Sequence, residues 1–103
     1  MDTFDSLIKK YLIYIQYEKR MSQNTVSSYW YDLRKYSNYL SSKFDIINVK
    51  DVKQRHIYEY IQSLSKYSNE NMKKTTIMRL ISSIKNFHSY LLLTNVISFD
   101  PSE

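Results

Sequence analysis

The stretch from Asn71 to Leu93, NMKKTTIMRLISSIKNFHSYLLL, decides the fold of this chain. Its apolar residues recur every three or four positions, which is the period of a helix with one buried face. At about 100° per residue, an arc of roughly 120° collects the expected core residues, namely Ile77, Leu80, Ile81, Ile84, Phe87, His88 and Leu91. We therefore expect this stretch to form the last long helix, packed by that arc against the rest of the chain.

The opposite arc of the same helix is polar and has no acidic residue. It carries Arg79, Ser82, Lys85, Asn86 and Ser89. No Asp or Glu occurs anywhere in residues 71–99. A solvated helix face usually mixes both signs of charge, because i,i+4 ion pairs stabilise it. This face instead suits a polyanion whose phosphates and base edges accept hydrogen bonds.

The composition indicates a single all-α domain. The chain has 103 residues, no Gly, no Cys and one Pro. Tight β-turns depend on Gly for positive φ, whereas helices joined by Asn- and Ser-containing turns do not. A chain of this length can bury a core without crosslinks, and the lack of Cys excludes disulfides and thiolate-bound zinc.

The hydropathy pattern gives no sign of a membrane protein. No apolar run approaches the roughly 18 residues of a membrane span, and the amino terminus is not a basic segment followed by an apolar one. We expect a cytoplasmic location, without a signal peptide and without membrane contact.

The net charge of +5 comes from two segments. Residues 19–44 and 71–99 each carry +4, residues 45–70 are neutral, and the ends 1–18 and 100–103 carry −1 and −2. A net positive charge alone is a weak indication of an acidic partner. If the two basic segments are neighbouring helices, however, they form one basic surface.

Residues 22–40, SQNTVSSYWYDLRKYSNYL, predict a second amphipathic helix. The inward arc holds Val26, Tyr29, Trp30, Leu33, Tyr36 and Leu40, and the outward arc holds Asn24, Ser27, Ser28, Tyr31, Lys35 and Asn38. Ser22 is the expected N-cap, and together with Asn24 and Thr25 it is equally suited to grip a phosphate at the helix N-terminus. Asp32 is the exception on this basic helix, and we expect it to orient a nearby cation or amide.

Two further helices complete the expected bundle. The first runs from Phe4 to about Tyr17 after a cap at Asp2 or Thr3. Ile13 points away from its apolar face, either as an ordinary exposed residue or as a contact with another protomer. A charge-balanced scaffold helix runs from about Lys53 to Lys66, after a loop over residues 41–49.

The carboxyl end is expected to be the start of a linker. The last helix should end near Thr94 and Asn95, because Asn tolerates the left-handed conformation that commonly follows a helix. Asp100 before Pro101 disfavours further helix. We therefore expect a domain over residues 1–99 and, at 100–103, the start of a linker to an absent carboxyl-terminal catalytic domain.

Three ordered sets of residues carry a resemblance to a known family. They are Ser22, Thr25, Tyr29, Asp32 and Leu33; then Thr76, Ile77, Arg79, Ile81, Ser82, Ile84, Lys85, Phe87, Tyr90 and Leu91; and then Asn95, Ile97, Asp100 and Pro101. In order and spacing the chain resembles the amino-terminal core-binding domain of tyrosine recombinases, of the Xer type and the lambda-integrase type. The resemblance implies a four- to five-helix orthogonal SAM-like bundle that grips recombination-site DNA as half of a C-shaped clamp during integration or recombination.

The resemblance also implies which residues contact DNA, since the second and fourth helices of that family face it. It places phosphate contacts at Ser22 and Thr25, and groove or backbone contacts at Arg79, Ser82 and Lys85. From the helical faces we add Asn24, Ser28, Lys35, Lys73, Lys74 and Asn86. Arg79 and Asn86 have the side-chain geometry for bidentate contacts to guanine and adenine. Asn95 and Asp100 depart from the Gly and Asn common in the family, and these departures affect the linker more than the binding face.

The family's chemistry belongs to a different domain. A tyrosine there attacks the phosphodiester and forms a 3′-phosphotyrosyl link, in a carboxyl-terminal domain that has no counterpart in this chain. We therefore predict that this chain is not itself an enzyme and that Tyr29 and Tyr90 are packing residues. We predict no cofactor, metal or small-molecule ligand. His88 should be a hydrogen-bonded, partly buried residue, and His56 has no second ligand at metal spacing.

The expected partners are double-stranded DNA and other recombinase protomers in a DNA-bound tetramer, with Ile13 as a candidate protomer contact. The alternative is a helical protein–protein interaction module without a DNA function, supported by Ile13 and the many tyrosines. A helix-turn-helix repressor fits less well, because both basic helices are long and a third helix separates them. A phage integrase, a Xer-type resolvase and a mobile-element recombinase all remain compatible with these residues.

Overall fold

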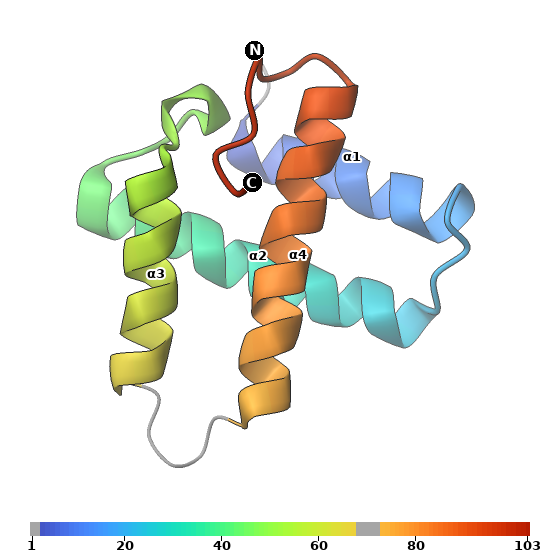
Figure 1. The fold of residues 1–103 in the computed structure, drawn as a ribbon. Coiled ribbons are helices and arrows are strands. Elements are labelled where there is room, and N and C mark those ends of the chain that lie inside the picture. The colour runs from blue at the N-terminus through green and yellow to red at the C-terminus, as the bar shows by residue number, and fades with distance from the viewer. Residues whose placement is uncertain (1–2, 68–72) are drawn as a thin grey trace.

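The computed structural model describes residues 3–67 and 73–103, which form four α-helices and one 3-10 turn without any strand. The elements are α1 (Phe4–Tyr17), α2 (Gln23–Phe44), η1 (Val49–Asp51), α3 (Gln54–Tyr67) and α4 (Lys74–Leu93). In Figure 1, α3 and α4 lie beside each other and both run across α2, while the upper half of α4 also crosses α1. The predicted all-α orthogonal bundle is confirmed.

Local signals fix where the helices begin and end. The Thr3 hydroxyl accepts the Ser6 N–H at 3.0 Å and caps α1. Asp45, with φ 56°, ends α2, and Asn95, with φ 62°, follows α4. Both side chains tolerate the left-handed conformation that Gly would otherwise supply. The prediction for Asn95 is confirmed, and a chain without Gly still terminates its helices.

An aromatic cluster at the helix crossings forms the centre of the core. Tyr36 of α2 is fully buried, and its ring lies 6.2 Å from that of Phe4, 5.4 Å from that of Tyr60 and 5.8 Å from that of His88. These three rings come from α1, α3 and α4, so one side chain contacts every other helix. Aromatic pairs at these separations stabilise a core beyond the area that they bury.

Two expectations about the core were wrong in detail. Residues 41–44 belong to α2 and not to a loop, because the helix continues until the left-handed Asp45, and the Phe44 ring packs 5.9 Å from Tyr39. Ile77 and Ile81 are half-buried and lie outside the main core cluster. The first turns of α4 extend past the crossing with α2 (Figure 1), so less of the bundle covers them.

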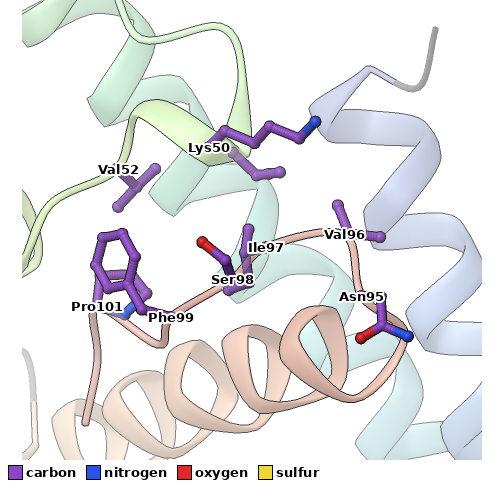
Figure 2. Close-up of a pocket in the computed structure, with 9 residues that line it drawn as sticks. Lys50, Val52, Asn95, Val96, Ile97, Ser98, Phe99 and Pro101 are labelled. Atoms are coloured by element: carbon purple, nitrogen blue, oxygen red, sulfur yellow. The ribbon is translucent and has the colours of Figure 1, made fainter.

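The segment after α4 folds back onto the bundle. Ile97 and Pro101 are buried, and a groove of about 490 Å³ opens between residues 95–101 and the η1 region. Figure 2 shows Phe99 and Lys50 at this groove, whose lining contains none of the residues expected to contact DNA. The molecule measures 36 × 31 × 21 Å, and no helix in the described part is long and apolar enough to cross a membrane.

Candidate nucleic-acid interface

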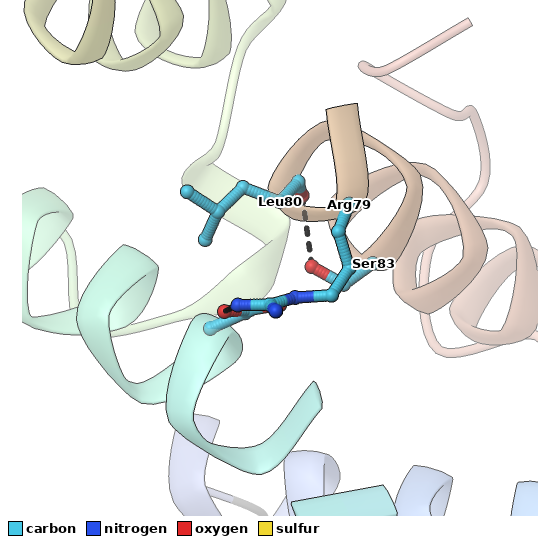
Figure 3. A network of polar contacts seen from close by, with 4 residues as sticks. Arg79, Leu80 and Ser83 are labelled. Atoms are coloured by element: carbon cyan, nitrogen blue, oxygen red, sulfur yellow. Dashed lines mark hydrogen bonds and ion pairs between the residues drawn. The ribbon is translucent and has the colours of Figure 1, made fainter. Parts of the chain in front are cut away.

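An arginine–carboxylate pair joins the two basic helices where they cross. Arg79 of α4 donates from Nε to Oδ2 and from Nη2 to Oδ1 of Asp32 on α2, both at 2.9 Å (Figure 3). The Asp32 side chain is 1% exposed, whereas that of Arg79 is 41% exposed. The hydrogen bond to Asp32 raises the pKa of the guanidinium, so it stays charged. The prediction that Asp32 orients a nearby cation is confirmed.

This pair brings the two basic segments to one side of the molecule. Lys35 follows Asp32 by three residues in α2, so it lies one helical turn further along the same edge. Lys35 is half-buried, and Ser28, one turn in the other direction, is half-buried as well. Arg79 and Lys35 therefore share one side of the molecule, as a combined basic surface requires.

The start of α2 is exposed and organised by its cap. Ser22 Oγ accepts the Thr25 N–H at 3.2 Å and lies 2.9 Å from Thr25 Oγ1. Ser22 and Asn24 are exposed and Thr25 is half-buried. The expected capping role of Ser22 is confirmed. A phosphate contact at the same residues stays a prediction.

The exposed residues of α4 fall into two rows. Arg79, Ser82 and Asn86 follow one another at helical spacing on the side toward α1 and α2. Lys74 and Lys85 lie about 100° further around the helix. All five are exposed, as is Lys73, which precedes α4 without a side-chain cap bond. The predicted polar arc of α4, with Arg79, Ser82, Lys85 and Asn86, is thus exposed, and Lys74 lies at its edge beside Lys85.

Asn86 lies in a groove between α4 and α1. The groove measures about 330 Å³, and its lining includes Tyr14 and Tyr90, whose ring centres are 5.0 Å apart. Lys19 also lines it, with its Nζ 5.8 Å from the centre of the Tyr14 ring. Met21, next to the Ser22 cap, completes this end. The groove thus connects Asn86 with the start of α2.

Lys19 is a candidate contact that sequence reasoning missed. It was counted in the basic segment 19–44 but given no role. Its position in the sequence could have indicated a role, because Lys19 lies three residues before Ser22, where a phosphate contact was expected. Only the packing of α1 against α4 places it near Asn86.

Comparison with known sequences identifies the family of this chain. The sequence profile of a family described as phage integrase, N-terminal SAM-like domain, matches residues 8–95. The chain belongs to this family. A tyrosine recombinase of Thermosipho africanus is 35% identical over 101 residues, which are 96% of this chain and 34% of the relative. Tyrosine recombinase XerD of Shewanella oneidensis is 36% identical over 97 residues, which are 94% of this chain and 31% of the relative. Tyrosine recombinase XerD of Staphylococcus haemolyticus is 32% identical over 98 residues, which are 95% of this chain and 32% of the relative.

The chain spans about a third of the length of these tyrosine recombinases. No solved structure matches it significantly. The chain therefore corresponds to one part of such a recombinase.

Two tyrosines of this integrase-family domain are packing residues, as predicted. Tyr29 is buried in the core cluster. Tyr90 is half-buried, with its ring centre 5.4 Å from that of Tyr11 and 5.0 Å from that of Tyr14.

The two histidines have structural partners. His88 is fully buried, and its Nε2 lies 2.8 Å from the Tyr36 hydroxyl, which confirms the expected hydrogen bond. Burial lowers the pKa of His88 to about 4, so the ring is neutral at pH 7. His56 Nδ1 accepts the Lys53 N–H at 2.9 Å at the start of α3, and burial also lowers the pKa of this ring. The described residues contain no group of three His, Cys, Asp or Glu that could hold a metal ion.

Proposed function

We propose that this chain binds double-stranded DNA through α2 and α4 as the core-binding part of a tyrosine recombinase. One observation carries the proposal. Asp32 is the only acidic residue in these two helices, and it is buried against Arg79. The exposed surface of both helices is therefore free of negative charge, which favours a polyanionic partner.

Four lysines supply the sequence-independent part of the binding. Lys35, Lys73, Lys74 and Lys85 have no ion-pair partner among the described residues. Each one that meets a phosphate releases condensed counterions, which strengthens binding at low salt. We expect log K to fall with log salt concentration with a slope of about −3.6 for four contacts.

The polar side chains of the same surface fix the position of the duplex. We assign phosphate contacts to Ser22 and Thr25 at the start of α2, where unpaired backbone N–H groups add to the hydroxyls. Hydrogen bonds to phosphates, sugars or base edges come from the remaining predicted residues, which are Asn24, Ser28, Arg79, Ser82 and Asn86.

The family membership supports the wider role. We propose that this domain forms half of a clamp around recombination-site DNA, and that the strand-cleaving tyrosine of the recombinase belongs to another domain. Further protomers are the expected protein partners on DNA. No catalysis is assigned to the residues described here.

A titration of fluorescent duplex DNA tests the proposal. The probe is a duplex of mixed sequence, measured by fluorescence anisotropy at several salt concentrations. Replacing Lys85 or Lys74 with Ala should each reduce the magnitude of the salt slope by about 0.9 and weaken binding at low salt. Lys50→Ala is the matched control, since Lys50 is an exposed lysine of η1 and lines a groove that contains none of the residues expected to contact DNA. If both α4 variants bind like Lys50→Ala, α4 is not part of the interface.

Exposed apolar residues of α1 favour a second candidate function, a contact with protein. Ile13 is 58% exposed and Tyr17 is 70% exposed, and their i,i+4 spacing places them on one face. An aromatic residue beside an aliphatic one is a suitable interface anchor. If Ile13→Asp abolishes self-association on DNA, as measured by sedimentation, without changing DNA affinity, this face is a protomer contact.

A further inference from the structure

The bond to Asp32 uses only part of the Arg79 guanidinium. The group has five N–H donors, and Asp32 takes one from Nε and one from Nη2. The other three, two on Nη1 and one on Nη2, form the outer edge of the fork. This edge has no bond to any residue that the structure describes, and the side chain is 41% exposed. A second bidentate contact is therefore geometrically available.

The pair differs from the lysines of the same surface in its charge. Asp32 and Arg79 sum to zero formal charge, so this arginine adds little to the counterion release that drives sequence-independent binding. What it offers is a fixed direction for two N–H donors. A planar donor edge of this kind matches the O6 and N7 acceptors of guanine in the major groove.

The buried position of Asp32 keeps the Arg79 guanidinium in one orientation. The carboxylate is buried at the crossing and accepts both bonds from the guanidinium, and Figure 3 shows Leu80 and Ser83 of α4 near Arg79. Ser83 is fully buried and donates its hydroxyl to the Leu80 carbonyl at 2.8 Å, so it makes no competing bond to Asp32. The rotamer freedom that a free arginine loses on binding is thus already lost in the folded domain.

We propose that Asp32 is a positioning residue that aims the outer edge of Arg79 at a guanine in the major groove, so that the pair determines sequence preference and not affinity. This inference rests on the proposed DNA-binding function. It assigns a role in recognition to a residue that does not itself touch DNA.

Asp32→Asn and Arg79→Lys test the inference, with circular dichroism to establish folding. Asp32→Asn keeps the shape of the side chain but leaves the guanidinium uncompensated. Binding to a mixed-sequence duplex should be equal or tighter, with a salt slope steeper by about 0.9. The second measurement selects bound duplexes from a library with a randomised segment. Among the duplexes that the wild-type chain selects, guanine should be enriched at one position. In Asp32→Asn that preference should fall about tenfold or more.

Arg79→Lys keeps the charge and one bond to Asp32 but lacks the planar fork. It should lose the same guanine preference, and it carries the test alone if Asp32→Asn does not fold. An unchanged preference in the folded variants, or an equal loss of affinity for all sequences, overturns the inference. Salt-dependent binding by the wild-type chain without any guanine preference overturns the inference alone. An absence of salt-dependent binding overturns the proposed function itself.

Discussion

Removing Arg79 should destabilise the fold, and removing Asp32 as well should restore part of the loss. Arg79→Ala leaves a carboxylate that is 1% exposed without its two hydrogen-bond donors. Breaking a buried ion pair in this way costs about 3–5 kcal/mol. Since Arg79 is 41% exposed, its removal opens a path for water to Asp32, so we expect the lower limit of about 3 kcal/mol. The double variant Asp32→Ala/Arg79→Ala has no unpaired charge and should be more stable than Arg79→Ala.

Urea unfolding followed by circular dichroism measures both differences. A loss of about 3 kcal/mol corresponds to a melting temperature lower by roughly 12–24 °C for a domain of this size. Lys85→Ala is the matched control, because Lys85 is an exposed cation of the same helix without an ion pair among the described residues, and it should change stability by less than about 0.5 kcal/mol. A double variant no more stable than Arg79→Ala refutes the claim that an unpaired buried carboxylate causes the loss.

Two further predictions concern the core and the helix ends. Burial lowers the pKa of His88 to about 4, and the unfolded ring titrates near 6.5, so the unfolded state binds more protons in between. Stability should therefore fall by about 3 kcal/mol as pH decreases from 6.5 to 4, and this slope should flatten in His88→Gln, as measured by urea unfolding at several pH values. Asn95 has φ 62°, so Asn95→Gly should preserve or raise the melting temperature, whereas Asn95→Val should lower stability by about 1–2 kcal/mol. Equal stability of the Gly and Val variants would contradict a left-handed residue after α4.

The fold was accessible to sequence reasoning because its signals are local. The 3.6-residue period of the apolar positions in residues 71–93, the cap at Ser22 and the absence of Gly each follow from the chemistry of neighbouring residues. All three predicted the right kind of structure. Burial of the first turns of α4 was overestimated, because it depends on where that helix crosses α2, and periodicity does not encode this position.

Sequence reasoning indicated that Asp32 has a partner but not which residue this partner is. Charge counting selected two helices for the candidate site, and Asp32 stood out as the acidic exception on one of them. It could not show that this partner is Arg79, which lies 47 residues away. The same limit applies to Lys19 and Asn86, which line one groove only because α1 packs against α4. Contacts between distant segments depend on the packing of the bundle, which the local pattern does not specify.

If the domain binds DNA as proposed, its size limits the number of base pairs that it can contact. Its longest dimension is 36 Å, which is close to one turn of B-form DNA, about 34 Å or 10 base pairs. A word of ten base pairs occurs by chance about once in a million positions, and a bacterial chromosome offers at least that many competing sites. Ten base pairs are therefore too few to specify a unique chromosomal site. A recombinase that acts at such a site must recognise additional base pairs through other domains or through a second protomer.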